Sequence, residues 1–269
     1  MCKTTKGPDI GRDARRPGRV RPGIDGKTPG RKTSTNQSIR WAVWFAITGD
    51  VRFLSHRDVM RLMARAGARA QLPIKMTQGF NPHPKLSLAL PRPVAVASRC
   101  ELLVIELSSA GQAHWSEDLS AQLPDGMKLI RCEPLRTGPP PQVRAASYEL
   151  ELHPDELEPV RARSAKLARQ KKWELSRPTR DRRRPGAKKL IDIKPAVTDL
   201  AVRGQKLCFT IAHTPSGAAR CEEVLALLGF ENGHNAFGRS RSEILAQVVR
   251  IDLQCDLHTE SQQIRTADL

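Results

Sequence analysis

The sequence is poor in aromatic residues and lacks the cysteine spacing of a metal or cluster site. Phe, Trp and Tyr make up only 4% of the 269 residues, so a core must consist mainly of Leu, Val, Ile and Ala. No two of the six cysteines lie within four residues of each other. This spacing excludes a zinc knuckle and a locally encoded iron–sulfur site, and scattered free cysteines are typical of the reducing cytoplasm.

Long apolar runs are also missing. No stretch approaches the roughly 20 uninterrupted apolar residues that a membrane-spanning helix needs. The N-terminus is charged and has no apolar segment of the kind found in signal peptides. We therefore expect a cytoplasmic protein with no membrane segment and no cofactor of its own.

Positive charge is in excess, and it is distributed unevenly. The net charge is +17, of which residues 1–39 contribute +7 (ten Lys and Arg, three Asp). Residues 161–189 contribute +11 (thirteen Lys and Arg, two acids), which leaves a net −1 for the rest. Two basic segments beside a nearly neutral remainder favour an anionic partner, which we predict to be RNA. The alternative is an arginine excess in solvated segments that bind nothing.

The apolar patterning predicts an α+β protein of two tandem ferredoxin-like halves, each with the order β-α-β-β-α-β. The first half reads as IRWAVWFAIT (strand), FLSHRDVMRLMARAGARAQLP (helix), KLSLALP and CELLVIEL (strands), QAHWSEDLSAQL (helix) and MKLIRCEPL (strand). The second reads as ASYELELH (strand), PDELEPVRARSAKLARQ (helix), KWELSRP and KLCFTIAHT (strands), ARCEEVLALLGF (helix) and ILAQVVRIDLQC (strand).

Composition also predicts the boundaries. Residues 1–39 have almost nothing to bury and are expected to be a disordered basic tail. The first half spans 40–136, and TGPPPQ at 137–142 is a natural linker. The second half spans 143–255 with a basic insert at about 177–189, and 256–269 form a C-terminal tail.

The first predicted helix has two faces. Ser55, with Asp58 three positions later, indicates its start, and Pro73 closes it. An apolar stripe would face the core, whereas Arg57, Arg61, Arg65 and Arg69 recur every four residues as a basic stripe. Such a stripe is usually a solvated face, but this one begins beside a conspicuous loop.

That loop is TQGFNPHPKLS, residues 77–87. Pro82 and Pro84 remove two backbone donors, and Gly79 allows a positive φ, so the loop should be stiff and largely preformed. It would display Gln78, Asn81, His83 and Lys85, and low loop entropy favours binding. For Phe80 two interpretations are open, a base-stacking platform or an anchor in the core; we expect the anchor.

The residues from Arg52 to Ser98 resemble the signature of the radical-SAM-linked protein family of unknown function. The family pattern is a basic residue, F-L-S-H-x-D, a helix, and S-Q-G-F-N-P-H-P-K-hydrophobic-S. The chain reads RFLSHRD and TQGFNPHPKLS at these places, and it departs from the pattern at Arg57, where Leu is usual, and at Thr77. A weaker match through KKLIDIKPAVTDL and SGAARCEEVLALLGF extends the resemblance to about residues 40–253.

The resemblance implies a partner protein but does not imply a reaction. Family members occur alone or fused to the C-terminus of radical-SAM, cobalamin-binding-type proteins, which implies a radical-SAM protein as partner. The chain itself has no three-cysteine cluster motif and so cannot be the radical-SAM enzyme.

Our first hypothesis is therefore an RNA-binding accessory domain acting with an RNA- or ribosome-modifying partner. Its candidate RNA-binding residues are eight polar or charged residues chosen from the two motifs: Arg52, Ser55, His56, Arg57, Gln78, Asn81, His83 and Lys85. The start of the helix would offer unpaired N–H groups to a phosphate. We also predict that the loop packs beside the helix start, with His83 and Lys85 near His56.

Two alternatives remain open. In a metal-independent endoribonuclease of duplicated ferredoxin-like fold, His56 or His83 would be the general base, with Lys85 stabilising the phosphorane. No second acid or base is identifiable for that reaction. The other alternative is a protein–protein adaptor that binds no nucleic acid.

Overall fold

The structure is a computed structural model that describes residues 38–109, 114–178, 186–213, 217–230 and 238–257. The described residues form one compact unit. The predicted tails lie outside the described residues except at their edges, since Ile39 already begins a strand and Asp256 ends one. Most of the basic insert, residues 179–185, also lies outside them.

The first half has the predicted β-α-β-β-α-β order. Its elements are β1 (Ile39–Ile47), a 3-10 turn η1 (Gly49–Phe53), α1 (His56–Arg69), β2 (Leu86–Leu88), β3 (Ala97–Leu107), α2 (Trp115–Ala121) and β4 (Met127–Leu135). The strands pair antiparallel in the spatial order β4-β1-β3, with β2 on the far edge of β3. This is the ferredoxin-like order, so the predicted fold class is confirmed for this half.

The second half repeats that order. Its elements are β5 (Gln142–Glu151), α3 (Pro154–Arg169), η2 (Lys194–Ala196), β8 (Val197–Arg203), β9 (Lys206–Ala212), α4 (Cys221–Leu227), α5 (Arg241–Gln247) and β10 (Val248–Asp256). The spatial order β10-β5-β9-β8 matches that of the first half. The duplication predicted from the order of elements is therefore present.

Two assignments in this half were wrong. KWELSRP is not a strand of the main sheet: β6 (Glu174–Pro178) pairs with β7 (Lys188–Asp192) in a separate two-stranded sheet. β8 fills the place instead, because Gly204, at φ +59°, allows a tight turn that folds β8 back onto β9. The start of ILAQVVRIDLQC is helical, because Ser240 and Glu243 form a capping box that begins α5.

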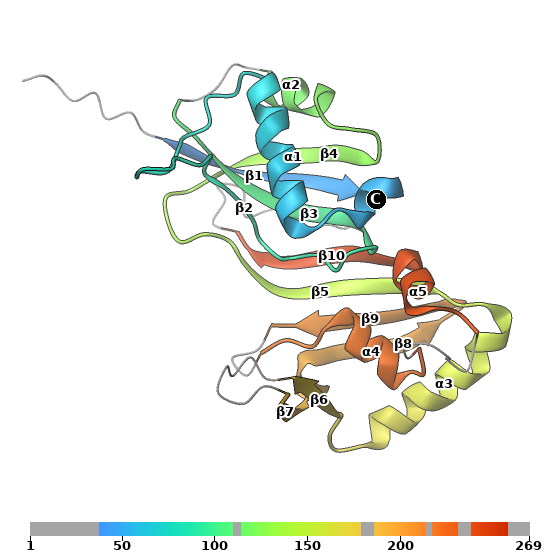
Figure 1. Cartoon of the computed structure of the whole chain (residues 1–269). Helices are drawn as coiled ribbons and strands as arrows, with labels where there is room; N and C mark the ends of the chain where they lie inside the picture. The colour runs from blue at the N-terminus through green and yellow to red at the C-terminus, as the bar shows by residue number, and fades with distance from the viewer. Residues whose placement is uncertain (1–37, 110–113, 179–185, 214–216, 231–237, 258–269) are drawn as a thin grey trace, which may run out of the picture. The chain divides into compact units, whose positions relative to one another are not determined.

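The halves join through β10 and β3. These strands pair parallel over only two positions, Val249 with Ala97 and Arg250 with Ser98, and so complete an eight-stranded sheet (Figure 1). Beside this short pairing the Arg250 side chain, fully buried, donates to the Glu101 carboxylate at 3.0 Å. It also donates to the Pro91 carbonyl at 2.9 Å and the Tyr148 hydroxyl at 3.2 Å.

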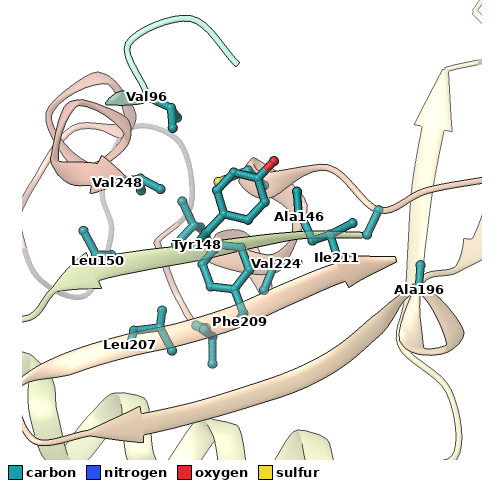
Figure 2. Close-up of a cluster of buried hydrophobic side chains, with 14 of the residues drawn as sticks. Val96, Ala146, Tyr148, Leu150, Ala196, Leu207, Phe209, Ile211, Val224 and Val248 are labelled. Carbon is teal, nitrogen blue, oxygen red and sulfur yellow. The ribbon is translucent and has the colours of Figure 1, made fainter. Parts of the chain in front are cut away.

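Two apolar clusters form the core. In the first half, α1 contributes Val59, Met63 and Ala66 to a cluster with β1, β3 and α2. The second cluster is larger and centres on the stacked rings of Tyr148 and Phe209, whose centroids lie 5.3 Å apart (Figure 2). None of the helices in the described part of the chain is long and apolar enough to cross a membrane.

Candidate nucleic-acid interface

The start of α1 is built as the sequence predicted. Ser55 is the N-cap: its hydroxyl accepts from the Asp58 N–H at 3.3 Å and donates to the Asp58 carboxylate at 2.6 Å. This hydroxyl is the main cause of the lowered pKa of Asp58. His56, half-buried, is the first residue of the helix, and its Nδ1 makes no hydrogen bond among the described residues. Arg52 lies in the turn before it, half-buried, and Arg57 is exposed.

A buried arginine that the sequence analysis did not select holds this turn in place. Arg92, in the connection between β2 and β3, is 9% exposed and donates to the carbonyls of Arg52, Leu54, Pro93 and Val96. The Ala95 N–H adds a bond to the Arg52 carbonyl. A charged residue between two prolines, in PRP, was the sequence signal for such a structural role.

The arginine stripe of α1 borders a groove. Arg57, Arg61, Arg65 and Arg69 are all exposed, and successive members lie about 6 Å apart along the helix axis. The α1 groove, a depression of about 450 Å³, is lined by Leu54, Asp58, Arg61, Leu62, Arg65, Arg69 and Pro124. Its single acid is already engaged, because Arg61 donates to Asp58 at 3.3 Å. Arg69 donates to Gln122 from the end of the groove.

The loop of residues 76–84 is closed by its own hydrogen bonds. The Thr77 N–H donates to the His83 carbonyl at 2.8 Å, and the His83 N–H donates to the Thr77 hydroxyl at 2.9 Å. A bridge between Met76 and Pro84 closes the base. Gly79 has a φ of +129°, a value that favours glycine. The loop is therefore closed by hydrogen bonds at its base, while its stiffness stays a prediction.

The position of Phe80, at the apex of the loop, differs from the expected one. Phe80 does not anchor the loop in the core but is fully exposed, at 106% of its reference area. The bonds between Thr77 and His83 hold the loop shut, so no apolar anchor is needed. Gln78, Asn81 and His83 are exposed beside it.

The base of the loop is held by one carboxylate. Glu106 accepts from Lys75 at 2.6 Å, from the Ser38 hydroxyl at 2.7 Å and from Lys85 at 3.1 Å. Lys75 is the main cause that lowers the pKa of Glu106 to about 2, with Ser38 and Lys85 adding to it. Lys85, one of the predicted site residues, is thus half-buried in an ion pair, and Ser38 brings the end of the basic N-terminal segment to the same point.

The predicted meeting of the loop with the helix start was wrong. The loop base is bonded to Glu106, which pairs with Arg40 at the start of β1, whereas the helix start follows Ile47, which pairs with Ser98. Glu106 and Ser98 are eight residues apart on β3, roughly 26 Å. The loop precedes β2, so it lies at the edge where β2 begins. The segment after β2, which contains Arg92, reaches the helix start instead.

Removing the Glu106 carboxylate gives a pH-dependent loss of stability. Because the pKa of Glu106 is lowered in the folded state, its contribution is present above about pH 4.5 and is lost as the pH falls through about 2. We expect Glu106→Gln to lower the free energy of unfolding by about 1–2 kcal/mol at pH 7, after allowance for solvent screening.

Urea unfolding between pH 7 and pH 2.5 measures this effect, and the difference should shrink towards the acid end. Glu133→Gln is the control, since Glu133 pairs with Arg131 on the exposed surface of β4. A Glu106 difference that stays constant down to pH 2.5 would contradict the assignment.

A comparison with protein families shows which family the chain resembles. Residues 40–223 match a family described as "Uncharacterized protein conserved in bacteria" (DUF2344). The chain belongs to this family. The region matched to DUF2344 contains the α1 groove, the loop and Glu106, and it ends within α4, so Arg250 lies beyond it.

Other comparisons add little to the family match. No curated protein matches the chain. A solved structure of an unknown protein from Galdieria sulphuraria is similar with 11% identity and a TM-score of 0.25, over 82% of this chain and 99% of that one. The small subunit of acetolactate synthase from Thermotoga maritima is similar with 12% identity and a TM-score of 0.23, over 84% and 99%.

The described residues of this DUF2344 protein contain no group of three or more His, Cys, Asp or Glu side chains placed to hold a metal ion. What the sequence analysis missed in the site is the apolar floor of the α1 groove, Leu54, Leu62 and Pro124. Leu54 lies within the quoted FLSH motif, but Pro124 follows α2 and becomes a neighbour only through the packing of α2 beside α1.

Proposed function

We propose that the chain is a cytoplasmic RNA-binding accessory domain that works with a radical-SAM protein on RNA or ribosomes. The observation that supports RNA binding is the α1 groove, where Arg61, Arg65 and Arg69 line an open depression beside an apolar floor. The likeness of RFLSHRD and TQGFNPHPKLS to the radical-SAM-linked signature supports the choice of partner.

The groove has the chemistry of a phosphate track. Arginine presents a planar fork that binds phosphate oxygens in pairs, and a row of arginines with a regular rise can follow a backbone. The basic segments at 1–39 and 161–189 would add sequence-independent affinity through released counterions. An adaptor that binds only protein would need no such row of three arginines in one groove.

Accessory binding is favoured over cleavage by the positions of the two histidines. A general acid and a general base must both reach the scissile phosphate. His56 lies at the start of α1 and His83 in the loop, at opposite ends of β3, so one RNA phosphate cannot reach both within a single chain.

Neutralising the groove tests the proposal. We expect Arg61→Gln/Arg65→Gln/Arg69→Gln to weaken binding of a mixed-sequence 20-nucleotide RNA by at least about 10-fold, because roughly two or three phosphate contacts are lost. The slope of log affinity against log salt should fall by about 2–3. Fluorescence anisotropy between 50 and 200 mM salt measures both quantities.

A matched control carries the same change in net charge elsewhere. Arg144, Arg203 and Arg241 are exposed arginines outside both basic segments, in ion pairs with Asp256, Asp199 and Glu222. Their triple Gln variant should bind RNA within about 3-fold of wild type, less than the loss of one full phosphate contact. Equal losses of RNA affinity in both triple variants would show that only net charge matters. That result would overturn the proposal that the α1 groove binds RNA. Cleavage of the RNA by the chain alone would favour the endoribonuclease.

A further inference from the structure

We propose that Phe80 is a stacking platform for an unpaired base of an RNA strand held in the α1 groove. The ligand is then single-stranded RNA rather than duplex. This inference rests on the proposed function and names its substrate class.

The exposure of Phe80 is the first observation. A Phe side chain left in water forgoes roughly 2–3 kcal/mol of burial, and Phe80 is exposed over its entire surface. Phe53, the other large exposed aromatic of the described residues, is 49% exposed and has the Arg52 guanidinium 5.1 Å from its ring centre. Both faces of the Phe80 ring are open to a ligand.

The backbone of the loop is fixed on both sides of Phe80, so the ring is already positioned before a ligand binds. The bonds between Thr77 and His83 and the bridge between Met76 and Pro84 fix the backbone on either side of the apex. Pro82 and Pro84 restrict the returning arm. Since the backbone is already ordered, binding costs little conformational entropy, which is the condition under which one stacked ring adds measurable affinity.

The loop begins where the α1 groove ends. The Leu72 N–H donates to the Gly67 carbonyl in the last turns of α1. A Cβ on Gly67 would lie 2.5 Å from Ile74 Cδ1, so this glycine lets the segment before the loop pack directly on the helix. Arg69 lines the groove at this end of α1. Six residues from Ile74 to Phe80 span at most about 20 Å, so a strand leaving the arginines comes within reach of the ring.

The size and surroundings of the exposed apolar area favour a base over a protein pocket. A stable protein interface buries about 800 Å² on each partner, whereas one aromatic side chain supplies roughly 150–250 Å². In the loop, Met76, 43% exposed, and the exposed Pro82 add to it, and the three side chains together remain far below the area of a protein interface. The exposed neighbours Gln78, Asn81 and His83 offer hydrogen bonds to base edges. Bases inside a duplex are already stacked and cannot use the ring.

Two substitutions at Phe80 test the platform. We expect Phe80→Ala to weaken binding of a 20-nucleotide single-stranded RNA by roughly 5- to 100-fold, with the salt slope unchanged because no phosphate contact is lost. Binding to a 20-base-pair duplex should not change. Phe80→Trp should keep the single-strand affinity, and its fluorescence should be quenched on binding. Ile130→Ala is the control and should bind within about 3-fold of wild type, because Ile130 is a 49% exposed apolar side chain on β4, outside the groove and the loop.

The outcomes separate this inference from the proposed function. If Phe80→Ala binds single-stranded RNA like wild type while the triple groove variant does not, stacking is wrong and the RNA-binding proposal stands. If the wild-type chain binds neither the single strand nor the duplex, both the stacking platform and the RNA-binding proposal fail. An equal loss for single strand and duplex also overturns the platform.

Discussion

Replacing Glu101 by alanine should lower the free energy of unfolding by about 3–5 kcal/mol, because it leaves the buried Arg250 charge without its counter-ion. Arg250 is 0% exposed and Glu101 is 2% exposed. Burial alone would lower the pKa of Arg250, but the Glu101 carboxylate and the Tyr148 hydroxyl raise it. The guanidinium therefore stays charged, and without Glu101 it would keep only two neutral acceptors, the Pro91 carbonyl and the Tyr148 hydroxyl.

Urea unfolding at pH 7 measures the loss. Asp199→Ala is the control, since it breaks the exposed ion pair with Arg203 and should cost no more than about 0.5 kcal/mol. The double variant Glu101→Leu/Arg250→Met should recover much of the loss, because two apolar side chains leave no buried charge. A cost below about 1 kcal/mol for Glu101→Ala would show that water reaches the pair.

This ion pair also shows why the junction of the halves escaped sequence analysis. Glu101 and Arg250 each interrupt an apolar strand, CELLVIEL and QVVRIDLQC, and a charge at such a position signals a buried partner. The identity of the partner depends on which strands are neighbours. Glu101 and Arg250 are 149 positions apart, and their strands pair over only two residues, so no local pattern connects them.

Local signals, in contrast, were sufficient for most elements. Ser55 caps α1, the apolar stripe of that helix is buried, and the order of elements in the first half is as predicted. β8 was missed because its sequence, VTDLAVR, is short and partly polar, although Gly204 marks the turn after it. The position of the loop was wrong for a topological reason: a segment before β2 and a segment after it lie at opposite edges of the sheet.

Replacing Phe209 and replacing Phe80 should have very different effects on the free energy of unfolding, although the sequence alone does not show which phenylalanine is buried. Phe209 is 1% exposed and its ring stacks on Tyr148 at 5.3 Å, inside the larger apolar cluster (Figure 2). We expect Phe209→Ala to lower the free energy of unfolding by about 3–5 kcal/mol, because apolar burial is lost and a cavity is left in the apolar cluster beside β9. Phe80→Ala should change stability by less than about 0.5 kcal/mol, because the ring contacts solvent on every side.

Thermal and urea unfolding of the two variants measure this difference, and Phe209→Leu, which keeps most of the side-chain volume, should recover part of the Phe209→Ala loss. Similar costs for Phe80→Ala and Phe209→Ala would mean that Phe80 is covered in solution, which would remove the open ring on which base stacking depends. A Phe80 variant that folds with wild-type stability therefore also makes its RNA-binding result interpretable, since a loss of affinity could not then come from unfolding.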